Sequence, residues 1–155
     1  MQTLIVETHI NISHEQCFDL ARDIPLHCAT AVDTGEHAID GVTEGLIGLG
    51  ESVTFEAVHF GIRQRLTAKV VEFEFPVRFV DEMTQGAFKS LRHIHEFTPQ
   101  DGGTLMRDTL IWTSPLGIIG RIADCLFLIR HMKKFLMKRN ANLKAYAEGL
   151  IDPIN

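Results

Sequence analysis

The amino-acid sequence predicts an α+β fold in which an antiparallel sheet covers a long C-terminal helix, with two short helices after the first strand. Three observations lead to this prediction. Residues 3–10 are rich in β-branched side chains, which favours a strand. Residues 51–113 form runs separated by turn signals, as consecutive antiparallel strands do. From Leu116 to about Leu150, apolar residues recur near helical spacing.

Two short helices are predicted directly after the first strand. Ser13 is followed three residues later by Gln16, a capping-box signature that predicts a helix over about 14–22. Pro25 suits the first turn of a second helix over about 25–32, where its missing N–H would have no partner in any case.

A hairpin is predicted around the turn Phe60-Gly61. A two-residue turn there sets four pairs opposite one another: His59 and Ile62, Ala57 and Gln64, Phe55 and Leu66, Val53 and Ala68. These eight residues share one mostly apolar face, so the register is self-consistent. The opposite face carries Glu56, Arg63, Arg65 and Lys69. Further strand breaks are predicted at Pro76, 84–86 and 101–103.

The predicted C-terminal helix is apolar nearly all round at its start and basic along its length. Its first turns carry Ile118, Ile119, Ile122, Leu126, Phe127 and Leu128. Such a segment is expected to be buried, to line a cavity or to form a subunit contact. Asp124 is the only acid between Arg121 and Lys144. A basic amphipathic helix favours a membrane surface or an acidic partner, and the alternative is a solvated outer face.

Length and composition indicate one globular domain over residues 1–155. The chain is 45% hydrophobic and 23% charged, with a formal net charge of −5. This balance argues against nucleic-acid binding through bulk charge. No uncharged apolar stretch is long enough to predict a transmembrane helix, and the first residues do not resemble a secretory signal. The oligomeric state is left open.

The three cysteines Cys17, Cys28 and Cys125 form no CxxC pair, and their odd number excludes a closed disulfide framework. They are expected to be reduced thiols in a cytoplasmic protein. Their apolar neighbours favour small core residues over nucleophiles.

Several motifs in the second half of the chain resemble one superfamily. They are Gly86-Ala87-Phe88-Lys89, His93-Ile94-His95-Glu96-Phe97, Gly103-Thr104-Leu105-Met106-Arg107-Asp108 and Ser114-Pro115-Leu116-Gly117. With the order of elements, they resemble the SRPBCC (START-like, helix-grip) superfamily, in particular its bacterial ligand-binding branch of polyketide cyclase- and dehydrase-like proteins. The resemblance covers essentially the whole chain. It implies a curved sheet of about seven strands that grips the C-terminal helix and encloses a cavity for a mostly apolar small molecule.

Alternation along residues 89–98 carries two imidazoles toward the predicted core. Leu91, His93, His95 and Phe97 share one face, and its apolar members indicate that this face points inward. The expected sheet lining of the cavity is Phe55, Ala57, His59, Gln64, Leu66, Phe79, Asp81, Met83, Leu91, His93, His95, Phe97, Met106, Asp108, Leu110 and Trp112. The expected helix lining is Ile122, Leu126 and Ile129.

Buried ionisable groups cost several kcal/mol unless they are paired, so the cluster of His93, His95 and Asp108 needs an explanation. One hypothesis is a polar patch that orients the ligand. A second is a cyclase or dehydratase in which His93 or His95 is the general base. A third is that the residues have no functional role, either as an Asp–His network that only fixes strand register or as imidazoles at a strand end that face water. The function favoured is binding of a lipid-like or polyketide-like molecule.

A metal site is a further hypothesis, because His-x-His on a strand offers two ligands, with a third possible from His59 or an aspartate. No tighter signature such as HExxH is present, and the resemblance implies no general need for a metal. No metal and no other cofactor is expected.

Overall fold

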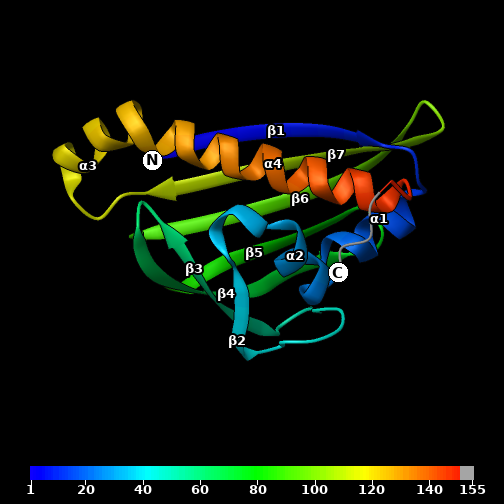
Figure 1. Cartoon of the computed structure of the whole chain (residues 1–155), viewed down its shortest axis with the longest axis horizontal. Helices are drawn as coiled ribbons and strands as arrows, with labels where there is room; N and C mark the ends of the chain where they lie inside the picture. The colour runs from blue at the N-terminus through cyan, green and yellow to red at the C-terminus, as the bar shows by residue number, and fades with distance from the viewer. Residues whose placement is uncertain (151–155) are drawn as a thin grey trace.

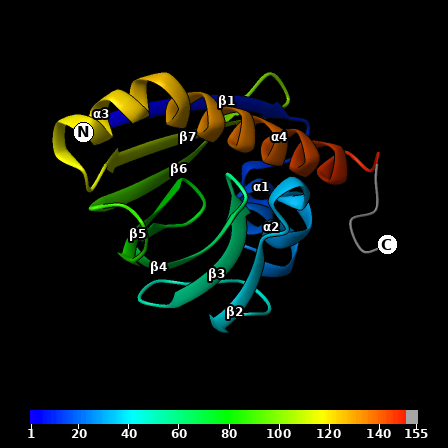
Figure 2. The ribbon, with the colours of Figure 1, turned by 60° about the vertical axis from the view of Figure 1, so that its left-hand side comes forward.

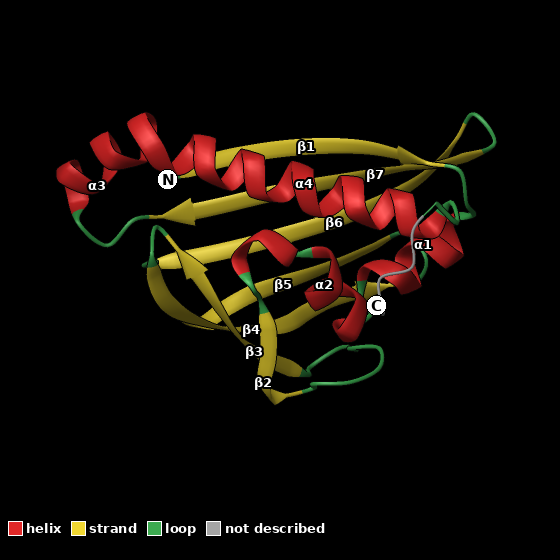
Figure 3. Cartoon of the chain, in the orientation of Figure 1, coloured by secondary structure: helices red, strands yellow, loops and turns green. Residues whose placement is uncertain are grey.

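The computed structural model describes residues 1–150 and shows a seven-stranded sheet with the helices on its concave face (Figures 1 and 3). The elements are β1 (Gln2–Ile10), α1 (His14–Ala21), α2 (Ile24–Thr30), a 3₁₀ turn (Val32–Thr34), β2 (His37–Gly41), β3 (Ser52–His59), β4 (Ile62–Glu74), β5 (Arg78–Gln85), β6 (Ser90–Gln100), β7 (Gly103–Thr113), α3 (Gly117–Ala123), a π-helical segment (Asp124–Leu128) and α4 (Ile129–Ala147). The strand order is β1-β7-β6-β5-β4-β3-β2, antiparallel throughout. The predicted helix-grip α+β fold is confirmed.

Both short helices begin within one residue of their predicted starts. The Ser13 hydroxyl accepts a hydrogen bond from the Gln16 N–H at 3.2 Å and caps α1. The Asp23 carboxylate accepts from the Leu26 N–H at 2.9 Å and caps α2, whose first turn contains Pro25. Each cap satisfies an N–H group that the helix itself leaves without a partner.

The β3–β4 hairpin has the predicted register. His59 lies opposite Ile62, and Val53 lies opposite Ala68. Phe60 and Gly61 have φ angles of 53° and 72°, the left-handed conformation that a tight two-residue turn requires. This register turns the apolar face of the hairpin toward the helices.

Helix α4 lies across the concave side of the curved sheet, and α1 and α2 close one end (Figure 2). Leu136 of α4 packs with Leu110 and Trp112 of β7. Leu143, two turns further on, packs in a second cluster around Phe18 of α1. A third cluster joins Ile24 of α2 to β3 and β4. The core therefore has three separate clusters between sheet and helices.

Two features differ from the sequence prediction. Strand β2 was not predicted, because it is a five-residue edge strand, mostly exposed, without apolar alternation and with a register shift between Ala38 and Asp40. The C-terminal helix is not one uniform α-helix over 116–150. It begins at Gly117, contains the π-helical segment and ends at Ala147. In the part of the chain that the structure describes, none of the helices has both the length and the apolar character needed to span a bilayer.

Candidate functional site

Two adjoining cavities lie between the concave face of the sheet and the helices. The inner cavity has a volume of about 120 Å³ and is lined by α2, α4 and the central strands. The outer cavity has a volume of about 280 Å³ and extends toward the tip of the β3–β4 hairpin and the β7–α3 connection. The volume of the outer cavity, taken by itself, is close to the lower end of the roughly 300–1,000 Å³ that is typical of small-molecule sites.

The two cavities share one wall, which consists of Glu36, Phe55, Leu66, Leu91, Met132 and Phe135. Five of these six side chains are apolar. A ligand that occupied both cavities would therefore lie along an apolar wall, with Glu36 as its one charged member.

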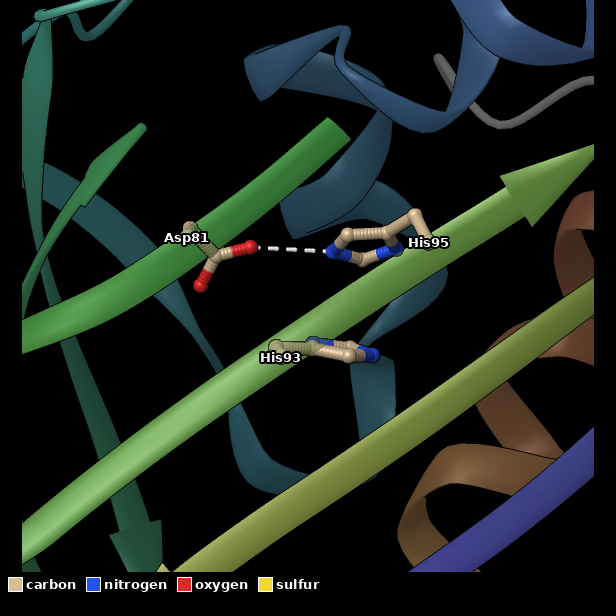
Figure 4. A group of neighbouring side chains, drawn as sticks. All are labelled: Asp81, His93 and His95. Carbon is tan, nitrogen blue, oxygen red and sulfur yellow. Dashed lines mark hydrogen bonds and ion pairs between the residues drawn. The ribbon is translucent and has the colours of Figure 1, made fainter. Parts of the chain in front are cut away.

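The polar centre of the inner cavity is built by β5 and β6. His93 and His95 on β6 both line the cavity, as does Asp81 on β5 (Figure 4). His95 Nε2 donates to Asp81 Oδ2 at 2.9 Å. The two imidazole rings lie with centroids 3.8 Å apart, and Phe79 stacks on His95 at 4.2 Å. The His95 ring is thus held between the rings of Phe79 and His93.

Asp108 on β7 lies behind both histidines and is fully buried. Its Oδ1 accepts a hydrogen bond from His93 Nε2 at 2.9 Å and lies 3.0 Å from His95 Nδ1. From α4, Asn140 Nδ2 donates to Oδ2 at 2.6 Å, and Arg139 Nη2 lies 3.6 Å from Oδ1. One carboxylate therefore connects β6, β7 and α4.

The network pushes the pKa values of the two histidines apart. Burial lowers the pKa of His93 to about 4, with repulsion from His95 as the next cause. Burial also acts against a charge on His95, but its hydrogen bonds to Asp108 and Asp81 outweigh burial and raise its pKa. Burial would raise the pKa of Asp108, yet the hydrogen bonds of both histidines hold it well below its usual range. His93 is accordingly neutral near pH 7.

A neutral His93 that donates from Nε2 presents Nδ1 as an acceptor. Among the side chains and backbone groups that the structure describes, none donates a hydrogen bond to this atom, and His93 borders the inner cavity. The arrangement can therefore accept one hydrogen bond from a hydroxyl or N–H group in the cavity.

Asp81, His93 and His95 are also the residues that could hold a metal ion, because one ligand atom from each lies within 4.8 Å of the others. His95 already bridges Asp81 and Asp108, and His93 donates to Asp108. The three side chains thus form a hydrogen-bonded network without a cation. The absence of a metal stays a prediction.

Most of the expected lining residues border one of the cavities. Those that do are Phe55, Ala57, His59, Gln64, Leu66, Phe79, Asp81, Leu91, His93, His95 and Leu110. Asp108 lies behind the cavity wall. Phe97 and Met106 pack in the cluster around Phe18, and Trp112 and Ile129 pack in the cluster around Leu136. Met83 is half-buried outside both linings.

The expectation that Ile122 and Leu126 line the cavity is wrong. Their side chains are 57% and 55% exposed, and neither borders either cavity. Helical spacing shows which residues share a face, but α3 extends past the end of β7, where no strand can cover that face (Figure 1). The residues of the C-terminal helix that do line the cavities come later: Leu128, His131, Met132, Phe135, Leu136 and Arg139.

Several lining residues were missed by sequence reasoning. His27 and Glu36 form an ion pair beside the inner cavity, and His131 contacts His59 at 2.8 Å beside the outer one. Asn140, which contacts Asp108 behind the cavity wall, was also missed. Its inward direction was predictable, because it falls four residues after Leu136 on the apolar stripe of the helix.

Of the three cysteines, the two whose side chains the structure describes, Cys17 and Cys28, line neither cavity. Cys17 is fully buried, and burial raises the pKa of its thiol to about 12. Burial also raises the pKa of Cys28. The side chain of Cys125 lies outside the described residues.

No family model and no curated protein matches the sequence. Solved structures match the fold. TTHA0849 from Thermus thermophilus superposes with a TM-score of 0.74 at 17% identity, covering 94% of this chain and 99% of that one. Major latex-like protein 151 from Panax ginseng gives 0.70 at 14%, covering 94% and 97%. The KanY protein gives 0.73 at 16%, covering 96% and 98%. At these identities, the likeness establishes a shared helix-grip fold and leaves function open.

Proposed function

We propose that the protein binds a hydrophobic small molecule between sheet and α4, with a hydroxyl or N–H group of that molecule donating to His93. The apolar body would lie along the shared wall and extend into the outer cavity. The observation that carries the proposal is the neutral, oriented imidazole of His93, which borders a cavity that continues along the mostly apolar shared wall. Apolar cavities with a few convergent polar groups are the usual design of ligand sites.

The same geometry favours binding over catalysis. A general base works best with a pKa near the working pH. The pKa of His93 is lowered by burial to about 4, which makes it a weak base at neutral pH. His95 already bridges two carboxylates, which favours its protonated form. A cyclase or dehydratase that uses either histidine as its base is therefore the less favoured hypothesis.

Native mass spectrometry of freshly purified protein tests the proposal. We expect a mass above that of the polypeptide, lost on denaturation, which identifies a bound small molecule. Leu66→Trp fills the wall between the cavities and should abolish this added mass. Val58→Trp is the matched control, because Val58 is 47% exposed on the opposite face of β3. If both variants retain the bound molecule equally, the molecule binds outside the two cavities, and the proposal is contradicted.

A further inference from the structure

The segment between β7 and α4 exposes an unusual number of large apolar side chains. We call the following six residues the apolar tip: Leu116, Ile118, Ile119, Ile122, Leu126 and Phe127. Each is between 55 and 75% exposed. Leu116 directly precedes α3, and the other five lie on α3 and the π-helical segment, which project past the end of β7 (Figure 1). Large apolar side chains exposed together on one short segment are typical of an interaction site.

The fold holds this segment in place. Asp124 is 2% exposed and accepts hydrogen bonds from Ser114 Oγ at 2.6 Å and Trp112 Nε1 at 3.4 Å. Gly120 packs so closely on Ser114 that an added Cβ would lie 2.9 Å from the Ser114 Cβ. The base of the segment is therefore docked on β7, while its apolar side chains face outward.

The chain that follows the apolar tip is basic. From Leu116 to Ala147, Asp124 is the only acidic residue, and it is buried. The exposed charged residues of the same span are Arg121, Arg130, Lys133, Lys134, Lys138 and Lys144, with Lys144 only partly exposed. This local positive charge occurs on a chain whose formal net charge is −5.

We propose that the apolar tip inserts into the surface of an anionic lipid bilayer, with Arg121 and Arg130 contacting lipid phosphates. Apolar side chains flanked by cations are the pattern that binds such surfaces. A second copy of the chain fits less well. A two-fold contact places the same patch against itself, which would bring the arginines and lysines of both copies together.

The apolar tip adjoins the outer cavity. Pro115, just before it, and Leu128, just after it, both line that cavity. Insertion of the tip would therefore bring the cavity next to the bilayer, from which a hydrophobic molecule could enter. This consequence rests on the proposed ligand binding, whereas bilayer docking itself does not.

Vesicle flotation at low ionic strength tests the inference. The full chain is mixed with vesicles of phosphatidylcholine alone or of phosphatidylcholine with phosphatidylglycerol. We expect flotation with the anionic vesicles, weakened by added salt because screening reduces charge attraction. Ile118→Ser combined with Ile119→Ser should lower the partition coefficient at least about tenfold, since one buried isoleucine is worth roughly that factor. Arg121→Gln combined with Arg130→Gln should weaken flotation with anionic vesicles specifically.

Two control variants make the test specific. Leu49→Ser removes a side chain that is 62% exposed outside the apolar tip, and Lys69→Gln removes an exposed charge on the outer face of β4. Both should float as the unmodified chain does, and thermal melting checks that every variant is folded.

No flotation of the unmodified chain, or flotation of the tip variants equal to that of the unmodified chain, overturns the inference. A dimer in sedimentation analysis that Ile118→Ser with Ile119→Ser dissociates, without vesicle binding, would assign the patch to self-association instead. Native mass spectrometry of the same double variant separates the two proposals, because its bound molecule should be retained.

Discussion

Asn140 on α4 donates a hydrogen bond of 2.6 Å to Asp108 on β7, and neither side chain is exposed to solvent. This bond connects α4 to the polar centre of the sheet. The carboxylate that it reaches also orients His93. The position of α4 and the orientation of His93, in the proposed ligand site, are therefore linked through a single buried carboxylate.

Asn140→Ala should destabilise the protein by about 1–3 kcal/mol, because it leaves a buried carboxylate oxygen of Asp108 without its donor. Urea unfolding measures the change in the free energy of unfolding. Asn142→Ala is the matched control on the same helix, since Asn142 donates to the Thr30 carbonyl in a half-buried position. A loss at Asn140 no greater than that at Asn142 would show that the link is unimportant.

The low pKa of His93 predicts a pH dependence of stability. Below its usual value of 6.5, an unfolded chain binds a proton at His93, whereas the folded chain does not until the pH is about 4. This contribution lowers stability as pH falls through that interval, by up to ~1.4 kcal/mol per pH unit. His95, with its raised pKa, acts with the opposite sign.

Comparison with His93→Gln isolates the first effect. Urea unfolding of both proteins across the interval should show a free energy of unfolding that falls less steeply with decreasing pH in the variant. Parallel curves would mean that His93 takes up its proton at the same pH in the folded and the unfolded chain, which contradicts a lowered pKa.

Recognition of a hydroxyl by His93 can be tested with two probes that differ in that group alone. Calorimetry should show tighter binding of 2-naphthol than of naphthalene, because only the former can donate to Nδ1. His93→Phe should remove this preference while keeping an aromatic ring in the wall. One good neutral hydrogen bond corresponds to about 0.5–1.5 kcal/mol, or roughly a twofold to thirteenfold preference. Unchanged discrimination in the variant would place the hydroxyl elsewhere.

The Asp81–His93–His95 group should not depend on a metal. Chelator treatment and zinc addition are both expected to leave the thermal midpoint unchanged, since each histidine already donates to a carboxylate. A midpoint that rises with zinc, and no longer does so in His95→Gln, would reveal a binding site by linkage.

Local patterns were enough to predict much of this molecule. The β3–β4 register followed from one two-residue turn, and the inward direction of His93 and His95 followed from strand alternation. The edge strand β2 escaped prediction because exposed edge strands need no apolar alternation. Ile122 and Leu126 were misplaced because periodicity along a helix does not tell where the covering sheet ends. The role of Asn140 depends on a β7 partner 32 positions away in sequence, which no local pattern encodes.

The pairing of β1 with β7 has a consequence for how the chain folds. The first strand hydrogen-bonds to the last, so that Glu7 meets Arg107 across 100 positions of sequence. Contacts this distant are slow to form, because a long loop must close before they yield any stabilisation. During synthesis, we therefore expect β1 to stay unpaired until β7, the last strand of the sheet, has left the ribosome.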